Sequence, residues 1–476
     1  MTKPKFYVTT PIYYINDVPH VGHAYSTIAA DVLARYWRGK LGDSNVFLLT
    51  GTDENSKKTI EAAKAVGQEI QEYTDQTAKK WEAIWKQLGI TNNGFIRTTE
   101  PAHVKAVQDV ILKIHEAGDI EKGVYEGPYC FKCEAFYRED ELIDGCCPIH
   151  KTEVEHLKEE NYFFKLSKYQ DQLKQYITDN PHFVEPESRR NEVSAFIDRG
   201  LEDVSISRAS QKWGIKLPFD ESQIIYVWFD ALINYLTGVG YPDDKYKEFW
   251  PANVHIVGKD IIKFHCIIWP AMLMSAGLEL PQKVFAHGFF TIDGEKISKS
   301  LGNAIDPVEL ANKYGNDALR YFLLREIPFG ADGDFSRERF KIVYETELGN
   351  KLGNLVTRTA AMLNKYCDGS FEKINPAKPL ALEDDIEKLK FEQYLQKIFV
   401  RIEELNTSIE ENKPWELVKT EPGKVKDVLS GIVSELVELS KWLEPVIPEA
   451  TAKIQKTFMG GKVDSSVGIL FPRVEE

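Results

Sequence analysis

The sequence has few cysteines and no long hydrophobic run, and these two shortages exclude two classes of protein. It contains six cysteines among 476 residues, which is too few for the disulfide framework of a small secreted domain. No apolar run is long enough to cross a bilayer, and Lys3 and Lys5 lead into a strand-like segment rather than a signal peptide. The composition therefore predicts a soluble, cytoplasmic protein with no membrane partner.

The sequence also lacks an excess of basic residues, because its formal net charge is −14. An acidic chain argues against nucleic acid as a partner, since nucleic acid favours basic surfaces. A nucleic-acid partner would therefore need local basic clusters. The candidates are Lys296 and Lys299, then Arg337, Arg339 and Lys341, and finally Lys351 and Arg358.

A first short motif, His20-Val21-Gly22-His23, follows a strand-like run over residues 6–10 and opens a helical pattern. A helix N-terminus offers unpaired N–H groups and the positive end of a dipole, which suits polyphosphate. Gly22 has no side chain, so a base or ribose could approach the backbone between the two imidazoles. By itself, such a histidine pair is more often a cap or a partly exposed pair.

A second motif, Lys296-Ile297-Ser298-Lys299-Ser300, lies between Gly294 and Gly302. Two lysines and two hydroxyls in a short loop suit closure over phosphates as charge develops on a leaving pyrophosphate. A lysine-serine loop taken alone is more often solvated surface. A chance occurrence of both motifs in this order, with a strand before the first, is improbable.

Four cysteines and a histidine are clustered in the first third of the chain. Cys130-x-x-Cys133 and, after thirteen intervening residues, Cys147-Pro-Ile-His150 have the spacing of a two-knuckle zinc site. Three thiolates and one imidazole fill a tetrahedron, so the spacing predicts one structural Zn²⁺ per chain. Cys146 is a competing ligand, although only Cys147 keeps the two-residue gap to His150. A free-thiol cluster and a disulfide are the alternatives.

Strand and helix alternate over the first hundred residues, whereas strand patterns disappear after about residue 345. The predicted class is α/β, with a Rossmann-like nucleotide-binding domain split by a zinc-knuckle insert and followed by an all-α bundle. The expected strands of the nucleotide fold are 6–10, 46–49, 94–97, 224–229, 254–257 and 284–290. The expected domains are 1–117 and 223–292 for the two halves of that fold, 118–222 for the insert, 293–345 for the lysine loop region and 346–476 for the helices.

The histidine and lysine motifs together resemble the HIGH and KMSKS signatures of class I aminoacyl-tRNA synthetases. The departures are Val21 for Ile and Ile297 for Met, which are both apolar exchanges. Across essentially the whole chain, further segments resemble the methionine enzymes of this class, of the bacterial one-zinc type. These segments are Pro11-Ile12-Tyr13-Tyr14, Gly51-Thr52-Asp53-Glu54, Tyr226-Val227-Trp228-Phe229-Asp230-Ala231, Gly258-Lys259-Asp260-Ile261 and Leu352-Gly353-Asn354-Leu355.

The resemblance implies an enzyme that activates L-methionine with ATP and Mg²⁺ as methionyl-adenylate. The methionyl group then passes to tRNA(Met), initiator and elongator. The resemblance assigns ATP binding to His20, Gly22, His23, Gly288, Lys296 and Lys299, with the two histidines and two lysines catalytic. It assigns the methionine ammonium group to Asp53, and the side-chain pocket to Ile12, Tyr14, Trp228, Ala231, Tyr235, Ile261 and His265. It makes the helical bundle anticodon-binding, through Asn354, Arg358 and Trp415.

Several alternatives are weighed against this assignment. The leucine, isoleucine and valine enzymes carry an editing insertion too large to fit between His23 and Lys296, and the cysteine enzyme uses a cysteine before its HIGH motif, whereas none precedes Cys130. A small-molecule nucleotidylyltransferase would leave the helical third without a role. A catalytically silent tRNA-binding protein would not need intact histidine and lysine motifs. Members of the family that the chain resembles often carry a C-terminal tRNA-binding domain used in dimerisation, whereas this chain stops at Glu476. A monomer is therefore expected.

The lysine loop generates a first prediction. Lys299→Ala should slow adenylate formation by roughly a hundredfold or more, because it removes a charge partner of the transition state. Methionine binding should change far less. Pyrophosphate exchange and equilibrium methionine binding measure the two effects separately, and a near-normal exchange rate would remove Lys299 from the mechanism.

Overall fold

The computed structural model describes residues 4–132, 134–148, 151–292, 294–297, 304–373 and 380–474, with the backbone alone at 135, 295 and 296. These residues divide into two compact units. Unit 1 comprises Met1–Pro19 and Trp37–His287, and unit 2 comprises His20–Tyr36 and Gly288–Glu476. Each unit is described by itself.

A six-stranded sheet forms the centre of unit 1, and every pair of neighbouring strands in it is parallel. Chain order reverses at β1, which has β2 on one side and β12 on the other. In open sheets of this kind, ligands bind beyond the carboxyl ends of the strands at the reversal. The sheet confirms the predicted Rossmann-like core. In order across the sheet, the strands are β3 (Gly94–Arg97), β2 (Val46–Asp53), β1 (Phe6–Tyr14), β12 (Val254–Gly258), β13 (Val284–His287) and β7 (Val184–Glu185).

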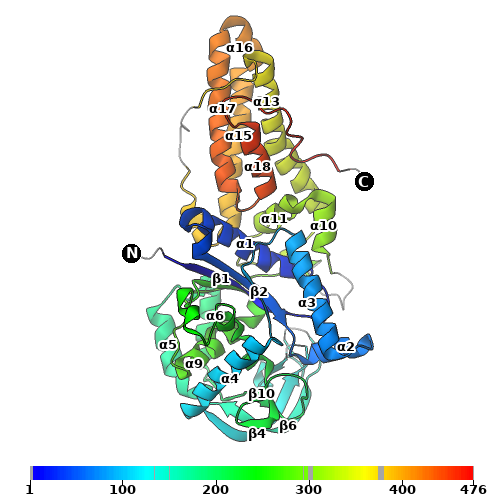
Figure 1. Ribbon diagram of the computed structural model, residues 1–476, viewed down its shortest axis with the longest axis vertical. Coiled ribbons are helices and arrows are strands. Elements are labelled where there is room, and N and C mark those ends of the chain that lie inside the picture. The colour runs from blue at the N-terminus through cyan, green and yellow to red at the C-terminus, as the bar shows by residue number, and fades with distance from the viewer. Residues whose placement is uncertain are drawn as a thin grey trace. The chain divides into compact units, whose positions relative to one another are not determined.

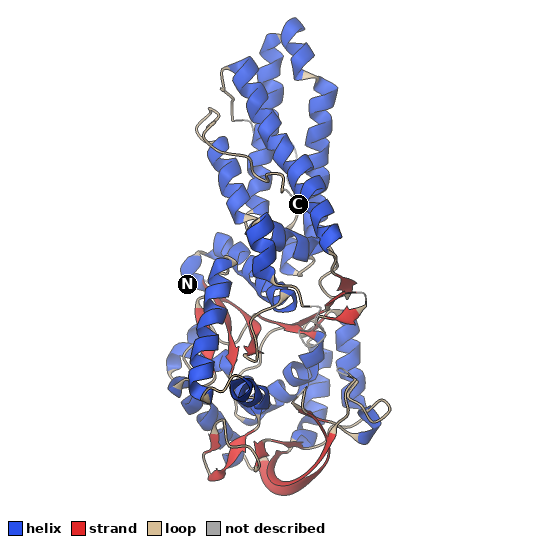
Figure 2. Cartoon of the chain, turned by 90° about the vertical axis from the view of Figure 1, so that its right-hand side faces the viewer, coloured by secondary structure: helices blue, strands red, loops and turns tan. Residues whose placement is uncertain are grey.

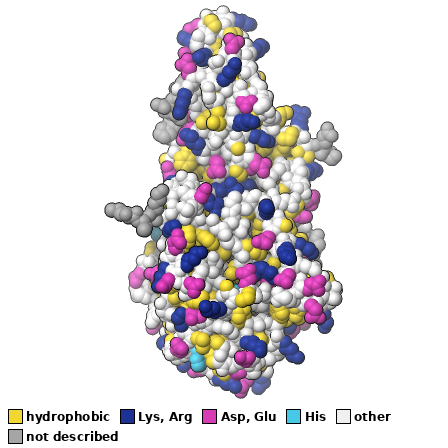
Figure 3. All heavy atoms as spheres, viewed as in Figure 1, with side chains coloured by type: hydrophobic (Ala, Val, Ile, Leu, Met, Phe, Trp, Pro, Cys, Tyr) yellow, Lys and Arg dark blue, Asp and Glu magenta, His cyan; other side chains and the backbone are white. Residues whose placement is uncertain are grey.

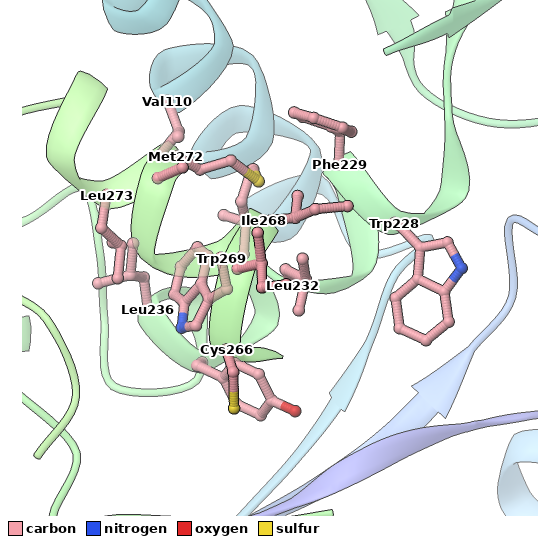
Figure 4. Packing of buried hydrophobic residues seen from close by; sticks show 14 of the residues in the cluster. Val110, Trp228, Phe229, Leu232, Leu236, Cys266, Ile268, Trp269, Met272 and Leu273 are labelled. Carbon is pink, nitrogen blue, oxygen red and sulfur yellow. The ribbon is translucent and has the colours of Figure 1, made fainter. Parts of the chain in front are cut away.

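The helices of unit 1 bury apolar side chains in one large core. Helix α4 begins at Pro101, and its buried residues recur at three-to-four spacing. Figure 4 shows Val110 of α4 beside Met272 and Trp269 of α9. The helices of this unit are α2 (Lys57–Ala65), α3 (Ile70–Gln87), α4 (Pro101–Glu116), α5 (Gln170–Asp179), α6 (Glu187–Asp198), α7 (Val227–Ala231), α8 (Asn234–Thr237) and α9 (Trp269–Ser275).

Two of the expected strands differ from the structure. Residues 224–229 do not join the main sheet, because β11 (Asp220–Ile225) pairs with β9 (Ser207–Arg208) and β10 (Lys216–Leu217) in a small sheet, and helix α7 follows. A short apolar run fits a strand or a buried helix equally well, so its pattern could not separate them. Residues 284–290 contain the whole of β13 and the first residue of β14 (Phe290–Ile292), a strand in unit 2.

The predicted insert contains a long antiparallel hairpin of β4 (Ile120–Cys130) and β6 (Glu155–Phe164). The short strands β5 (Ala135–Phe136) and β8 (Val204–Ser205) extend it to four strands in the order β5-β4-β6-β8. The hairpin is the long curved ribbon in Figure 2. Its pairing runs up to Tyr129 and Glu155, so Cys130 lies at the end of the hairpin.

Unit 2 begins with the first part of α1 (Val21–Leu41) and a small sheet in the order β15-β14-β16. Its strands are β14 (Phe290–Ile292), β15 (Glu295–Lys296) and β16 (Gly333–Asp334). Beyond β16, every regular element in the described ranges is a helix, as predicted, and the long helices run side by side (Figure 1). None of the described helices is long and apolar enough to cross a bilayer.

The helices of this part follow a regular pattern of sequence signals. Prolines open α16, α17 and α18, where a missing N–H costs nothing, and α15 buries one stripe at three-to-four spacing. The helices are α10 (Pro307–Tyr314), α11 (Asn316–Arg325), α12 (Arg337–Val343), a π-helical segment (Tyr344–Gly353), α13 (Asn354–Cys367), α14 (Glu383–Glu387), α15 (Phe391–Asn412), α16 (Pro414–Thr420), α17 (Pro422–Leu443) and α18 (Pro448–Thr457).

A buried ion pair within unit 2 joins α1 to the helices that follow the lysine loop. The Arg320 guanidinium is 2.7 Å from the Asp31 carboxylate, and both residues are almost fully buried. Arg320 also donates to the carbonyl oxygens of Val446 and Pro445, at 2.8 and 2.9 Å, between α17 and α18. A buried charge needs such partners, so this pair specifies how three segments of unit 2 meet.

We expect Arg320→Met to lower the free energy of unfolding by about 3–5 kcal/mol, because it leaves the Asp31 charge buried with fewer partners. The matched control is Arg337→Met, which breaks an ion pair of Arg337 with Glu309 that is half exposed and should cost about 1 kcal/mol or less. Urea denaturation compares the two variants. Equal small losses of unfolding free energy in the two variants would show that the buried ion pair does not stabilise the fold.

Candidate active site

Asp53 ends β2 with its carboxylate buried beside the end of β1. Tyr14 is its partner across the parallel ladder, so both side chains lie at the carboxyl edge of the sheet. Asp53 is 4% exposed, and its Oδ1 has no hydrogen-bond partner among the described residues. Burial, with the charges of Asp230 and Glu134, raises the pKa of Asp53 well above its usual value. A buried, unpaired carboxylate oxygen is a binding position for a cation.

The residues that follow Asp53 are fixed by hydrogen bonds to other elements. Glu54 accepts from both Nε and Nη2 of Arg97, at 2.7 and 3.0 Å. Asn55 donates to Asp230 at 2.7 Å, and the other Asp230 oxygen is 2.7 Å from Nε2 of His103. Asp230 and His103 are both fully buried. The Asp53 segment is therefore held rigidly at the end of its strand.

Two aromatic pairs contain residues that the resemblance assigned to a side-chain pocket. Trp228 stacks on Phe264 with ring centroids 3.8 Å apart, and its Nε1 has no described partner. In Figure 4 its ring lies to one side of the cluster around Trp269. Tyr235 and Nε2 of His265 are 2.7 Å apart, and Nδ1 of His265 is 2.9 Å from the carbonyl oxygen of Ile261.

The second aromatic pair has a defined protonation state. A carbonyl oxygen only accepts, so Nδ1 of His265 donates to Ile261, and Nε2 accepts from the Tyr235 hydroxyl. Burial lowers the pKa of His265 to about 4, so the imidazole is neutral near pH 7. Ile12, Tyr14 and Ile261 pack against the same core, which also contains Tyr235 and Trp228, and Ala231 is buried one turn after Trp228. Unit 1 thus offers an apolar, aromatic, uncharged surface near one carboxylate.

In unit 2, the His20-Val21-Gly22-His23 motif starts helix α1 at Val21, as predicted. The N–H of Gly22 donates to Nδ1 of His20 at 3.0 Å, and the N–H of His20 donates to Nδ1 of His23 at 3.1 Å. This is a reciprocal helix cap made by two imidazoles, which stack at 3.8 Å. Because both Nδ1 atoms accept, each neutral ring carries its proton on Nε2.

Glycine is required at two positions near this motif. A Cβ atom on Gly22 would lie 2.8 Å from Cε1 of His20, so the missing side chain makes room for that imidazole. A Cβ on Gly288 would lie 2.0 Å from the carbonyl oxygen of Ala331. Lys299, and the side chain of Lys296, lie outside the described residues.

Two segments of the cysteine cluster share one backbone feature. Cys130 and Cys147 are buried, and the residue four positions after each has a left-handed backbone, with φ of 49° at Glu134 and 51° at Lys151. The N–H of Lys151 donates to the carbonyl oxygen of Cys147 at 2.8 Å. Cys146 is paired in a β-bridge with Ile143 and is more exposed than Cys147. Cys133 and His150 lie outside the described residues, and the described ones alone form no metal-binding group.

The three residues assigned to an anticodon lie in α13 and α16. Asn354 opens α13 and is exposed, whereas Arg358 and Trp415 are half buried. The Arg358 guanidinium lies 5.3 Å from the Trp415 ring centroid and forms an ion pair with Glu410 at 2.6 Å. The structure therefore brings Arg358 and Trp415 together. Basic and acidic side chains are interspersed on the face seen in Figure 3, as the net charge of −14 suggests.

Sequence reasoning assigned no role to His103, Glu134, Asp230 or Phe264, which support the Asp53 and Trp228 segments. Asp230 lies inside the Tyr226–Ala231 segment, so an acid among apolar neighbours was a usable signal. His103 and Glu134 approach from distant parts of the sequence, and no local pattern marks them.

The chain matches the family model for class I tRNA synthetases (M) over residues 6–156 and 140–360. The methionine–tRNA ligase of Caldanaerobacter subterraneus is 46% identical over 95% of this chain and 73% of that protein. The Rickettsia bellii ligase is 44% identical over 94% and 91%. A Mycobacterium tuberculosis methionyl-tRNA synthetase in complex with methionyl-adenylate superposes with a TM-score of 0.93 at 38% identity, covering 99% of this chain and all of that one.

His265 generates a pH prediction. Its pKa is about 4 in the folded chain and about 6.5 in an unfolded one. The unfolded state therefore takes up the proton first as the pH falls. The stability associated with the neutral imidazole is fully present above pH 6.5, and it is lost progressively as the pH falls to 4. Between pH 7 and pH 5 its share of the loss in unfolding free energy should be about 2 kcal/mol.

His265→Gln should lose less stability over this interval than the unmodified chain does, as urea denaturation at both pH values would show. The matched control is His182→Gln, because the side chain of His182 is 81% exposed, and it should keep the full pH dependence. An unchanged pH dependence in His265→Gln would contradict a buried neutral imidazole.

Proposed function

Because this chain belongs to the methionyl-tRNA synthetase family of class I enzymes, we propose that it is a methionine–tRNA ligase. It ligates L-methionine to tRNA(Met), initiator and elongator, and consumes ATP through a methionyl-adenylate intermediate. The observation that carries an amino acid as the substrate is the buried Oδ1 of Asp53, unpaired among the described residues, and the choice of methionine rests on the family. An ammonium group supplies the missing partner, and an uncharged thioether suits the aromatic surface near it.

The first step joins methionine to the nucleotide. The methionine carboxylate attacks the α-phosphorus of ATP, the bond to the β-phosphate oxygen breaks, and pyrophosphate leaves. Histidines 20 and 23 donate from Nε2 to phosphate oxygens, while Lys296 and Lys299 neutralise charge on the leaving group. Gly288 lies beside the adenosine. Mg²⁺ bound with ATP offsets part of the triphosphate charge. No protein nucleophile is needed, because alignment and charge stabilisation lower the barrier.

In the second step, the 2′-hydroxyl of the terminal adenosine of the tRNA attacks the carbonyl carbon of the adenylate, and AMP leaves. The side-chain pocket holds methionine through both steps with neutral groups. These are Ile12, Tyr14, Trp228, Ala231, Tyr235, Ile261 and His265. Residues 1–117 and 223–292 form the catalytic domain in this proposal, 118–222 the connective insert, 293–345 the stem-contact region and 346–476 the anticodon-binding domain. A cytoplasmic location and a monomeric state stay predictions.

Amino-acid-dependent exchange of pyrophosphate into ATP tests the function. L-methionine should support exchange, whereas L-leucine and L-isoleucine should support little. Asp53→Asn should raise the KM for methionine strongly, because hydrogen bonds to charged groups contribute about 1.5–3 kcal/mol. Exchange driven equally by leucine would contradict the assignment of the amino acid.

Zinc fits the cysteine cluster as a structural ion. The matched turns at Cys130 and Cys147 present two buried thiols, and Cys133 and His150 supply the two remaining ligands in the proposed set. Zn²⁺ bound by three thiolates and one imidazole holds the end of the insert together. Cys147 is the better ligand than Cys146, because it keeps the two-residue gap to His150 and its side chain is buried, whereas Cys146 is more exposed.

We predict one zinc per chain in the unmodified protein. Cys130→Ser should lose it, because one of four ligands is removed, while the matched variant Cys146→Ser should retain it. Elemental analysis of the purified proteins measures the zinc content per chain. Equal loss from both variants, or no zinc in the unmodified chain, would refute the ligand set.

Asn354, Arg358 and Trp415 are the proposed anticodon contacts. An aromatic ring offers a stacking surface for an unpaired base, and an arginine binds base edges or phosphate. The cation–π contact of Arg358 with Trp415 supports this role, since it orients two recognition groups together.

Trp415→Ala should reduce tRNA aminoacylation efficiency by the roughly 1–3 kcal/mol of one stacked base. Methionine activation without tRNA should stay nearly intact. Aminoacylation, pyrophosphate exchange and a melting temperature separate the outcomes. A parallel fall in both activities with a loss of stability would make Trp415 a core residue instead.

A further inference from the structure

Glu134 follows directly after the first cysteine pair, yet its side chain points into the protein. The residue is 2% exposed, and its backbone is left-handed. Both features are costly, because a Cβ atom strains the left-handed region and burial disfavours a carboxylate. Lys151 occupies the same position in the second turn, with the same backbone, and is exposed. The turn therefore explains the conformation of Glu134 but not its burial.

The first contact of Glu134 reaches the segment after Asp53. Its Oε1 accepts a hydrogen bond from the backbone N–H of Lys58 at 3.2 Å, in the first turn of α2. A carboxylate at a helix N-terminus satisfies an N–H that has no partner within the helix and meets the positive end of the dipole. The Lys58 ammonium group lies 4.0 Å from the ring centroid of Tyr14. Glu134 thus holds the helix that begins just after Asp53.

The second contact reaches the segment before Trp228. The backbone carbonyl oxygen of Glu134 accepts a hydrogen bond from the hydroxyl of Tyr226, which is itself buried. Tyr226 is the N-cap residue of α7, the helix that carries Trp228 and Ala231. One residue of the insert is therefore bonded to both segments that carry the proposed methionine contacts.

We propose that Glu134 is a positioning residue of the methionine site, which fixes the Asp53 and Trp228 segments relative to each other. It acts through hydrogen bonds and does not touch the substrate. The inference rests on the proposed function, because it concerns affinity for L-methionine. It also gives the zinc insert a role in amino-acid binding, since the turn after Cys130 sets the place of Glu134.

The test compares Glu134→Ala with Glu134→Gln and with the matched control Lys151→Ala. Methionine binding is measured by tryptophan fluorescence without ATP, the KM values for methionine and ATP by pyrophosphate exchange, and zinc by elemental analysis. Glu134→Ala should weaken methionine binding about tenfold, because a helix N–H loses its acceptor. Its KM for ATP should stay within about twofold, and zinc should be retained. Glu134→Gln should bind within about threefold of the unmodified chain, since the amide oxygen still accepts.

Unchanged methionine binding in Glu134→Ala would overturn the inference, as would an equal loss in Lys151→Ala. If Glu134→Ala lost its zinc, Tyr226→Phe would test the second contact by itself, because it removes only the hydroxyl that donates to the backbone carbonyl oxygen of Glu134. A weaker binding of methionine at full zinc content would then support the inference, and unchanged binding would overturn it. Failure of the unmodified chain to bind methionine would instead refute the proposed function.

Discussion

The buried carboxylate of Asp53 is the constraint around which unit 1 is arranged. An acid held away from water with one oxygen unpaired among the described residues is costly, and its raised pKa expresses that cost. Neighbouring elements have to keep it in place, and Arg97, Asp230 and Glu134 do so through the residues that follow it. A ligand cation brought to Oδ1 would favour the ionised form. Binding energy is thus available where the chain alone leaves a polar atom unsatisfied.

In unit 2, backbone groups fix the chemistry of two histidine side chains. At the start of α1, two backbone N–H groups donate to the Nδ1 atoms of His20 and His23, so the tautomer of each imidazole follows from helix capping. Within unit 2, Asp31 on the same helix is bonded to Arg320, whose guanidinium also binds carbonyl oxygens between α17 and α18. The helix that carries the histidine motif is therefore joined by buried polar contacts to the helical part of that unit.

Local patterns in the sequence were sufficient to predict most of the helices and strands. They were insufficient to predict which distant residues contact each other. The start of α1 at Val21 and the bounds of β3 agree with the predictions, because caps and apolar periodicity are local signals. The run at 224–229 was only partly right as a strand, because Ile224 and Ile225 end β11 whereas Val227 begins α7, and burial on all sides hides the change of period. Contacts of Asp230 with His103 and of Glu134 with Lys58 join residues more than seventy positions apart, and only the folded chain brings them together.

The most direct measurement of the central claim is calorimetric binding of L-methionine beside 4-(methylthio)butanoate, which lacks only the ammonium group. If Asp53 selects its ligand through a buried carboxylate, the analogue should bind at least about tenfold more weakly than methionine to the unmodified chain. In Asp53→Asn, the difference between the two ligands should shrink. Equal affinity of the two ligands for the unmodified chain would contradict the account.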